Sequence, residues 1–131
     1  MGKTAFLFTG QSSQYVGMGK SLYEGSDECH ALFDRASEIM EKDIASICFD
    51  GPKEVLDMTE NTQPCILTTE YAAFAALRAA GVSCDAMAGF SLGEYGALAA
   101  AGVFSFEDAL RIIKIRARAM QEAVPAGKGA M

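Results

Sequence analysis

Ala88-Gly89-Phe90-Ser91-Leu92-Gly93-Glu94 joins a predicted strand to a predicted helix and contains the pattern G-x-S-x-G. Residues 82–88 are mostly apolar and follow a glycine, a pattern that predicts a buried strand. Residues 92–101 are rich in alanine and leucine, which predicts a helix. The G-x-S-x-G pattern between them places Ser91 on a tight strand-to-helix turn, where the glycines leave room for the chain to reverse. Chance gives this pattern in on the order of a few per cent of chains of this size, so we interpret Ser91 as a nucleophile.

Composition excludes several classes of function. The chain has 131 residues, 50% of them hydrophobic, and a net charge of −6. It is long enough for one core, its acidic balance argues against nucleic-acid binding, and no apolar run reaches the length of a membrane span. The cysteines are widely spaced and form no C-x-x-C motif, so we expect neither a metal site nor a disulfide framework from Cys29, Cys48, Cys65 and Cys84. Buried reduced thiols are the expected role, which favours a cytoplasmic protein.

Apolar periodicity and turn residues predict how the elements follow one another. Strands are expected at 4–9 and 82–88, and a third begins at Ala130-Met131. Helices are expected at 26–42, 44–49, 52–58, 61–80, 92–101 and 105–124, with Pro64 in the first turn of the fourth. Strands that alternate with helices predict an α/β fold whose parallel sheet is covered on both faces. Because so short a sheet is incomplete, we expect the chain to be a piece of a larger protein.

The last predicted helix carries an arginine on its apolar face. At about 100° per residue, that face is made of Phe106, Ala109, Ile112, Ile113, Ala119, Met120 and Ala123. Arg116 falls in the middle of it. A guanidinium in apolar surroundings needs a carboxylate partner. That partner is either an Asp or Glu of the protein or the carboxylate of a ligand.

Gln11 follows the first predicted strand, at the edge of the sheet where ligands bind in open α/β folds. Its backbone N–H could complete an oxyanion hole together with the N–H of Leu92. The alternative is an ordinary solvated loop amide. His30 is the only histidine, and it lies off the apolar face of its helix. We therefore expect a surface histidine, and a chain that supplies a nucleophile without its general base.

Four motifs in this order and spacing resemble those of bacterial malonyl-CoA:acyl carrier protein transacylases and of related acyltransferase domains in polyketide and fatty-acid synthases. They are Phe8-Thr9-Gly10-Gln11-Ser12-Ser13-Gln14 with Gly17-Met18-Gly19, then Asn61-Thr62-Gln63-Pro64, Gly89-Phe90-Ser91-Leu92-Gly93-Glu94-Tyr95, and Arg116 to Gln121. The resemblance covers the whole chain. It implies that residues 1–131 are the amino-terminal portion of an α/β-hydrolase-like large subdomain. The ferredoxin-like subdomain and the catalytic histidine of the family would lie outside the chain.

The resemblance implies a role for each matching residue. Ser91 would be the acylated nucleophile, and Gln11 with the N–H of Leu92 would form the oxyanion hole. Arg116 would clamp the free carboxylate of the malonyl group, and Gln63 would line the site.

The chain departs from the family pattern at two places. Phe90 stands before the serine where the family usually has histidine, and Ser12-Ser13 replaces the usual Gly-Ser of the loop. Both are expected to change the shape of the substrate pocket and the preference among acyl-CoA substrates.

The expected function is transfer of a malonyl group from malonyl-CoA to the phosphopantetheine thiol of acyl carrier protein, through a seryl acyl-enzyme and without a permanently bound cofactor. The expected partners are acyl carrier protein, malonyl-CoA and the remainder of the same domain. Two alternatives remain. One is a thioesterase or esterase that uses the same serine turn, and the other is a fragment that is inactive without its carboxyl-terminal half.

Overall fold

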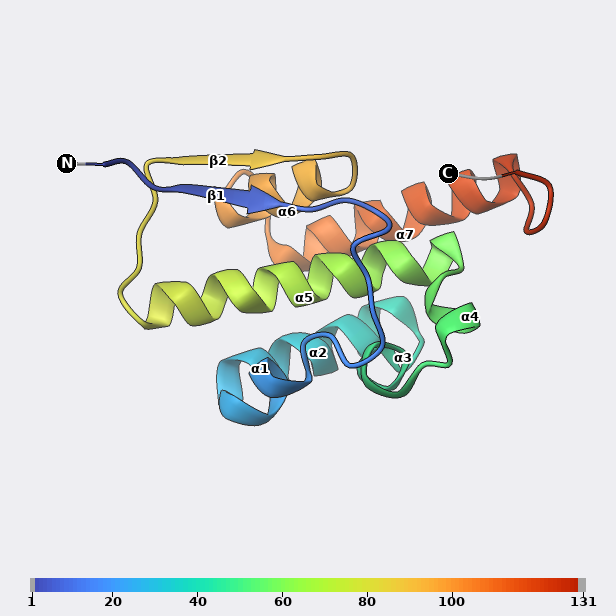
Figure 1. Cartoon of the computed structure of the whole chain (residues 1–131), viewed down its shortest axis with the longest axis horizontal. Coiled ribbons are helices and arrows are strands. Elements are labelled where there is room, and N and C mark those ends of the chain that lie inside the picture. The colour runs from blue at the N-terminus through green and yellow to red at the C-terminus, as the bar shows by residue number, and fades with distance from the viewer. Residues whose placement is uncertain (1, 130–131) are drawn as a thin grey trace.

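Residues 2–129 are described by a computed structural model, in which a pair of parallel strands lies beside a layer of helices (Figure 1). The strands are β1 (Ala5–Phe8) and β2 (Ala86–Gly89), and Ala5 pairs with Ala86 and Phe8 with Gly89 at the ends of the register. The helices are α1 (Lys20–Gly25), α2 (Asp27–Met40), α3 (Ile44–Asp50), α4 (Lys53–Leu56), α5 (Thr59–Ala79), α6 (Gly93–Ala100) and α7 (Phe106–Ala123). The predicted α/β fold with a short parallel sheet is therefore confirmed. The strand expected to begin at 130–131 lies outside the described residues.

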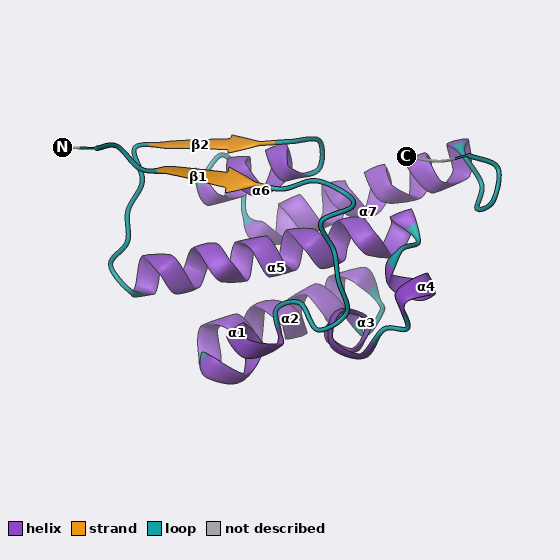
Figure 2. Ribbon diagram, viewed as in Figure 1, coloured by secondary structure: helices purple, strands orange, loops and turns teal. Residues whose placement is uncertain are grey.

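The long helix α5 is central to the packing. It runs below the strands, and α2 and α7 pack along it (Figure 2). The large side chains buried between these helices are Phe33, Ile44, Leu56, Leu67, Leu110 and Ile113. A smaller cluster of Phe8, Phe74 and Ala97 joins the sheet to α5 and α6. Burial of each large apolar side chain contributes about 1.5–3 kcal/mol, and this smaller cluster attaches the strands to the helical layer.

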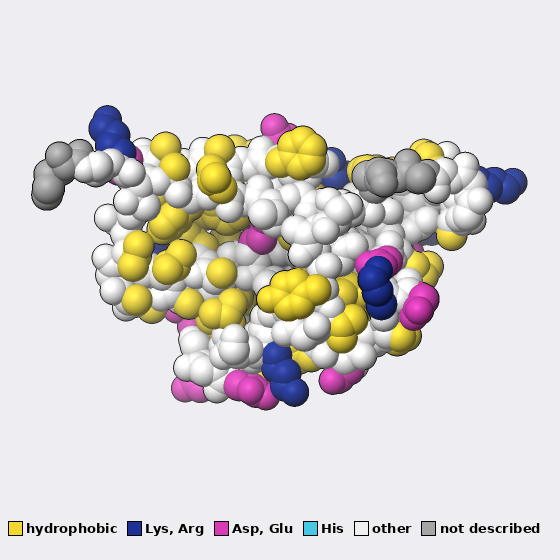
Figure 3. Space-filling model, viewed as in Figure 1, with side chains coloured by type: hydrophobic (Ala, Val, Ile, Leu, Met, Phe, Trp, Pro, Cys, Tyr) yellow, Lys and Arg dark blue, Asp and Glu magenta, His cyan; other side chains and the backbone are white. Residues whose placement is uncertain are grey.

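One face of the sheet is uncovered within residues 2–129, which corrects the prediction of a sheet buried on both faces. Leu7 is 75% exposed, and Ala86 and Ala88 of β2 are exposed. Hydrophobic side chains gather over the strands in the view of Figure 3. The apolar run at 82–88 predicted burial correctly on only one side, because the described helices pack against one side of the strands.

Two predicted helix starts are confirmed by their caps. Ser26 Oγ accepts a hydrogen bond from the backbone N–H of Cys29 at 3.3 Å, and Ser105 Oγ accepts one from Asp108 at 3.0 Å. The prediction for Pro64 was wrong, since α5 begins at Thr59 and Pro64 is its sixth residue. At this position the proline lies beyond the first turn, and the helix lacks the hydrogen bond that a residue 64 N–H would donate to the carbonyl of Glu60. Helix α1 was not predicted.

The buried seam of α7 also differs from the prediction. It consists of Phe106, Ala109, Leu110, Ile113 and Ala117, whereas Ile112, Ala119 and Ala123 are exposed. The seam follows the i, i+3, i+4, i+7 spacing, but it is rotated from the predicted face because α2 and α5 both pack on this helix. Arg116 stands beside the seam and is half-buried. None of the helices within residues 2–129 combines the length and apolarity needed to cross a membrane.

Candidate active site

The turn between β2 and α6 forms as its sequence predicts. A methyl group on Gly89 would lie 2.1 Å from the carbonyl oxygen of Gly93, and one on Gly93 would lie 2.2 Å from that of Phe8. Both positions therefore require glycine, the first to let the turn close and the second to let α6 approach β1. Ser91 has a φ of 55°, in the left-handed region that non-glycine residues rarely adopt. A conformation of this kind costs about 1–3 kcal/mol and is concentrated at functional sites.

Ser91 is contacted by the arginine that the sequence singled out. The Nη2 atom of Arg116 donates a hydrogen bond to Ser91 Oγ at 3.0 Å, and its Nη1 atom donates to Gln63 Oε1 at 2.7 Å. The guanidinium carbon lies 5.4 Å from the centre of the Tyr95 ring. Three helices thus meet at Ser91, since Gln63 comes from α5, Tyr95 from α6 and Arg116 from α7.

Gln63 is completely buried and has a defined orientation. Its Nε2 atom lies 3.2 Å from the sulfur of Met120, and its Oε1 atom accepts from Arg116. A buried amide needs partners for both of its ends, and here the arginine supplies the donor. Gln63 therefore holds the guanidinium beside the serine.

Arg116 forms no ion pair with an acid of residues 2–129, although five arginine ion pairs occur elsewhere in that range. Of the two partners considered from sequence, the internal Asp or Glu is not found among the described residues. The hydrogen bonds of the guanidinium go to the neutral oxygens of Gln63 and Ser91. A positive charge whose described acceptors are neutral is suited to an anionic ligand.

The loop after β1 lies against the Ser91 turn. A methyl group on Gly10 would come within 2.8 Å of the carbonyl oxygen of Phe90, so the two backbones are in close contact one residue before Gln11 and Ser91. The backbone N–H groups of Gln11 and Leu92 donate no hydrogen bond within residues 2–129. Oxyanion holes are commonly formed by unpaired backbone N–H groups on adjacent turns, such as these two.

The side chains of the two predicted oxyanion residues have structural contacts. Leu92 is fully buried at the start of α6. Gln11 donates from Nε2 to Thr59 Oγ1 at 3.0 Å, while its Oε1 atom is shielded from solvent and has no partner in residues 2–129. Gln11 is therefore more than a solvated loop amide.

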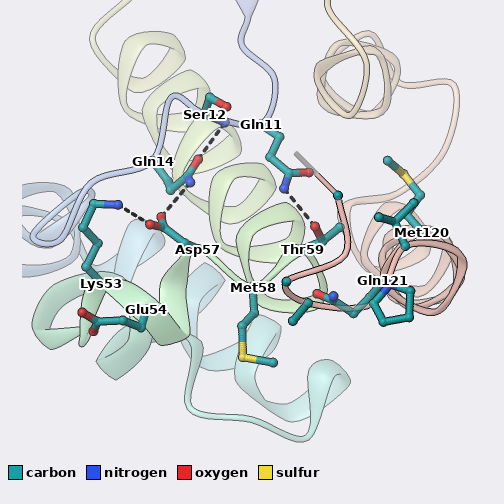
Figure 4. A pocket seen from close by; sticks show the side chains of 15 residues that line it. Gln11, Ser12, Gln14, Lys53, Glu54, Asp57, Met58, Thr59, Met120 and Gln121 are labelled. Atoms are coloured by element: carbon teal, nitrogen blue, oxygen red, sulfur yellow. Dashed lines mark hydrogen bonds and ion pairs between the residues drawn. The ribbon is translucent and has the colours of Figure 1, made fainter. Parts of the chain in front are cut away.

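A cavity of about 760 Å³ opens beside Gln11 (Figure 4). The loop after β1, the segment from α4 to the start of α5 and the end of α7 line it. In Figure 4, Gln11 reaches across to Thr59 and Gln14 to Asp57, the latter over 2.9 Å between Nε2 and Oδ1. Hydrogen bonds from Lys53 and from Gln14 hold the pKa of Asp57 below its ordinary value. The cavity thus has the charged and amide side chains of the loop and α4 on one side and Met120 and Gln121 of α7 on the other.

Phe90 extends from the turn into solvent. Its side chain is 75% exposed, and its ring contacts the backbone of Gly10. With Leu7 and Ala88 it lines a shallow depression of about 560 Å³ at the end of the strands. The structure therefore places Phe90 beside the loop, outside the cluster of Arg116, Gln63 and Ser91.

His30 is an exposed residue of α2, as predicted. Its ring stacks on Tyr23 with 3.9 Å between ring centres, and its Nε2 atom lies 3.3 Å from Asp34 Oδ2. Within residues 2–129 no group of three or more His, Cys, Asp or Glu side chains could hold a metal ion. Cys29, Cys48 and Cys65 are buried free thiols and Cys84 is half-buried.

Four further residues of the site were not found from the sequence. Thr59, Tyr95 and Met120 contact Gln11, Arg116 and Gln63, and Glu70 accepts from Thr9 at the base of the loop. Met120 follows Arg116 by four positions on α7, a spacing that could have indicated it, and Tyr95 lies at the start of α6 four residues after Ser91. Thr59 and Glu70 carry no such signal.

The chain is similar in sequence and in structure to known acyl transferases. Residues 5–131 match the family described as "Acyl transferase domain". Over 131 residues the chain is 50% identical to the malonyl CoA-acyl carrier protein transacylase of Bacillus subtilis (strain 168), covering all of this chain and 41% of that protein. The chain thus spans about two fifths of the length of this relative.

Two solved structures have the same fold. The malonyl CoA-acyl carrier protein transacylase of Clostridium perfringens superposes with a TM-score of 0.89 at 44% identity, over 96% of this chain and 40% of that one. A malonyl-transacylase in complex with its type II PKS acyl-carrier protein superposes with a TM-score of 0.89 at 38% identity, over 96% and 41% of the two chains.

Proposed function

The chain belongs to the acyl transferase domain family, and from this premise we propose that the protein transfers a malonyl group from malonyl-CoA to the phosphopantetheine thiol of an acyl carrier protein. The relative from Bacillus subtilis and the structure from Clostridium perfringens are both named for this activity. Malonyl-CoA and the carrier thiol enter as substrates, and the proposal needs no permanently bound cofactor. On this proposal, residues 1–131 are the amino-terminal portion of the large subdomain.

The observation that carries the proposal is the hydrogen bond between Arg116 and Ser91. A malonyl group differs from an acetyl group by one free carboxylate, a short distance from the thioester carbon. A cation directly beside the nucleophile, with only neutral acceptors among its described hydrogen bonds, can pair with that carboxylate through a two-point contact. An acetyl group would leave the same charge without an anionic partner.

The proposed reaction has two steps. In the first, Ser91 Oγ forms a bond to the thioester carbon, its proton passes through a general base to the departing sulfur, and the C–S bond breaks to release CoA as the thiol. The backbone N–H groups of Gln11 and Leu92 stabilise the negative charge on the carbonyl oxygen. In the second, the carrier thiol gives its proton to the base and attacks the ester carbon, and the base passes that proton to Ser91 Oγ as the C–O bond breaks. No histidine contacts Ser91 within residues 2–129, so the proposal takes the base from outside this range.

The three buried free thiols support a reducing, cytoplasmic location in this proposal.

The test compares malonyl and acetyl transfer by the complete protein and its Arg116→Ala variant. Loss of a charged hydrogen-bonding partner should lower kcat/KM for malonyl-CoA by about 10²–10³-fold, and should leave that for acetyl-CoA within about tenfold of the parent value. Arg118→Ala is the control, because Arg118 is an exposed neighbour on α7 that pairs with Glu122. Equal losses for the two acyl groups would show that Arg116 only supports the fold.

Malonyl-CoA supplied without carrier protein distinguishes transfer from hydrolysis. A transferase should release one equivalent of CoA per active site and then stop, leaving an acyl-enzyme that mass spectrometry detects on Ser91. Continuous release of free malonate would instead identify a thioesterase.

A further inference from the structure

Glu70 is an acidic side chain in an unusual place, at the centre of α5 and directed toward β1 and α6. Its Oε1 atom accepts a hydrogen bond from the Thr9 hydroxyl at 2.9 Å. Its Oε2 atom is shielded from solvent and has no partner in residues 2–129. A methyl group on Gly96 of α6 would lie only 3.1 Å from this oxygen. The carboxylate therefore sits where α5, the end of β1 and the helix after Ser91 meet.

In the described part of the chain, the groups around Glu70 include no cation that would offset the cost of shielding its carboxylate from water. Thr9 faces it from the end of β1 and Gly96 faces it from α6, and no Lys, Arg or His of residues 2–129 pairs with it. Burial raises the pKa of Glu70 to about 7, and the hydroxyl and backbone N–H of Thr9 offset part of that effect. An apolar residue would fill this place without the desolvation cost.

Thr9 connects the carboxylate to the loop that carries Gln11. The Thr9 hydroxyl lies 2.9 Å from Ser13 Oγ, and Ser13 Oγ donates to the carbonyl oxygen of Gly10 at 2.7 Å. Each hydroxyl has one hydrogen: Thr9 donates its hydrogen to Glu70 Oε1 and Ser13 donates its hydrogen to the Gly10 carbonyl, so the Thr9 and Ser13 oxygens lie in direct contact between these two hydrogen bonds. The chain of contacts thus runs from α5 to the residue before Gln11.

The position of this loop matters because it touches the Ser91 turn. Gly10 and Phe90 are in backbone contact, and the Phe90 N–H donates to Phe8 at 3.1 Å. A small displacement of Thr9–Ser13 would move the unpaired N–H of Gln11 relative to Ser91 Oγ. Misplacing a reacting group by about 1 Å can cost on the order of 10²-fold in rate.

We propose that Glu70 is a positioning residue for acyl transfer: through Thr9 and Ser13 its carboxylate fixes the loop that presents the Gln11 N–H beside Ser91. This inference rests on the proposed function and extends it to a residue that touches neither substrate nor nucleophile. On this proposal, the free-energy cost of desolvating Glu70 is offset by its role in holding the loop in place.

The test uses the complete protein and measures the rate of Ser91 acylation by malonyl-CoA together with KM. Glu70→Ala should lower kcat by about ten- to a hundredfold, while KM changes less than about threefold because Arg116 and Gln63 are untouched. Thr9→Val should reproduce much of this loss in kcat. Thr9→Ser keeps the hydroxyl and should therefore retain the kcat of the parent. The double variant Glu70→Ala/Thr9→Val should be no slower than the slower single variant.

Either of two results would overturn the proposal: a Glu70→Ala enzyme within twofold of the parent in kcat, or losses in Glu70→Ala and Thr9→Val that multiply in the double variant. Thermal unfolding of each variant identifies any that fails to fold, and Thr9→Val, at an exposed position, still tests the link. The activity of the parent protein distinguishes failure of the proposed function from failure of the positioning role. Without Ser91-dependent malonyl transfer the proposed function itself fails, whereas with it an unaffected Glu70 variant refutes only the positioning role.

Discussion

Replacing Glu70 by glutamine should change the pH dependence of stability in a direction fixed by the structure. Burial raises the pKa of this carboxyl from an ordinary 4.5 to about 7 in the folded protein. The folded state therefore holds a proton that the unfolded state has already released at intermediate pH. Glu70 favours folding below pH 4.5, and this contribution is lost as the pH rises through about 7.

The magnitude follows from the same two values. At about 1.36 kcal/mol per pH unit, the gap between 4.5 and about 7 corresponds to about 3 kcal/mol, and about 2 kcal/mol is a fair lower figure for a half-buried group. Glutamine has nearly the same shape and does not ionise. The free energy of unfolding of Glu70→Gln, minus that of the parent, should thus rise by about 2–3 kcal/mol between pH 4 and pH 8. Any constant loss from the altered hydrogen bond with Thr9 cancels from this rise.

Urea unfolding followed by far-UV circular dichroism, repeated across this pH range, measures the difference directly. Glu24→Gln serves as the control, since it removes an exposed carboxylate from α1. A difference curve for Glu70→Gln that stays flat to within about 0.5 kcal/mol would refute the reasoning, as would an equal slope for Glu24→Gln. If Glu70→Gln is more stable than the parent at pH 8 and is also acylated more slowly, Glu70 favours activity at a cost in stability, as expected of a positioning residue.

Two further predictions concern the turn and the arginine. Gly93→Ala should destabilise the protein by about 1–3 kcal/mol, because the new methyl group would meet the carbonyl of Phe8 at 2.2 Å; Gly25→Ala, where nothing lies within 4 Å, is the control in the same thermal unfolding assay. Gln63→Leu should raise KM for malonyl-CoA about tenfold and leave KM for acetyl-CoA nearly unchanged, since it removes the acceptor that holds Arg116 at 2.7 Å. Steady-state kinetics with both substrates checks this, and parallel changes in the two KM values would contradict it.

Local patterns predicted the elements of this fold well. The turn around Ser91 was foreseen because its requirements are local: two glycines where side chains would collide and a serine between strand and helix. The helix starts at Ser26 and Ser105 were foreseen for the same reason, and both serines cap their helices. Pro64 was misplaced because proline is favoured at the start of a helix, whereas α5 begins five residues earlier, at Thr59, and buries Asn61–Cys65.

At the site, the contacts between residues far apart in the sequence could not be predicted. Arg116 was singled out because a charge interrupts an apolar pattern, yet its actual neighbours, 53 and 25 residues away along the chain, are neutral. The face predicted for α7 was rotated because periodicity gives the spacing of a seam, and the helices packed against it decide which residues fill it. Glu70 gave no signal at all, since an acidic residue on a helix is ordinarily solvent-exposed.

The contact between Arg116 and Ser91 links substrate recognition to activation on the proposed function. Before substrate arrives, the guanidinium donates one N–H to Ser91 Oγ and so occupies a lone pair that must attack the thioester. A malonyl carboxylate is a stronger acceptor than a neutral hydroxyl and draws that N–H toward itself. Gln63 limits how far the guanidinium can follow, because its buried amide retains the other N–H at 2.7 Å. Binding of the correct acyl group would then release the nucleophile, whereas an acetyl group would leave Arg116 in place on Ser91 Oγ, so discrimination would be expressed in the acylation rate as well as in binding.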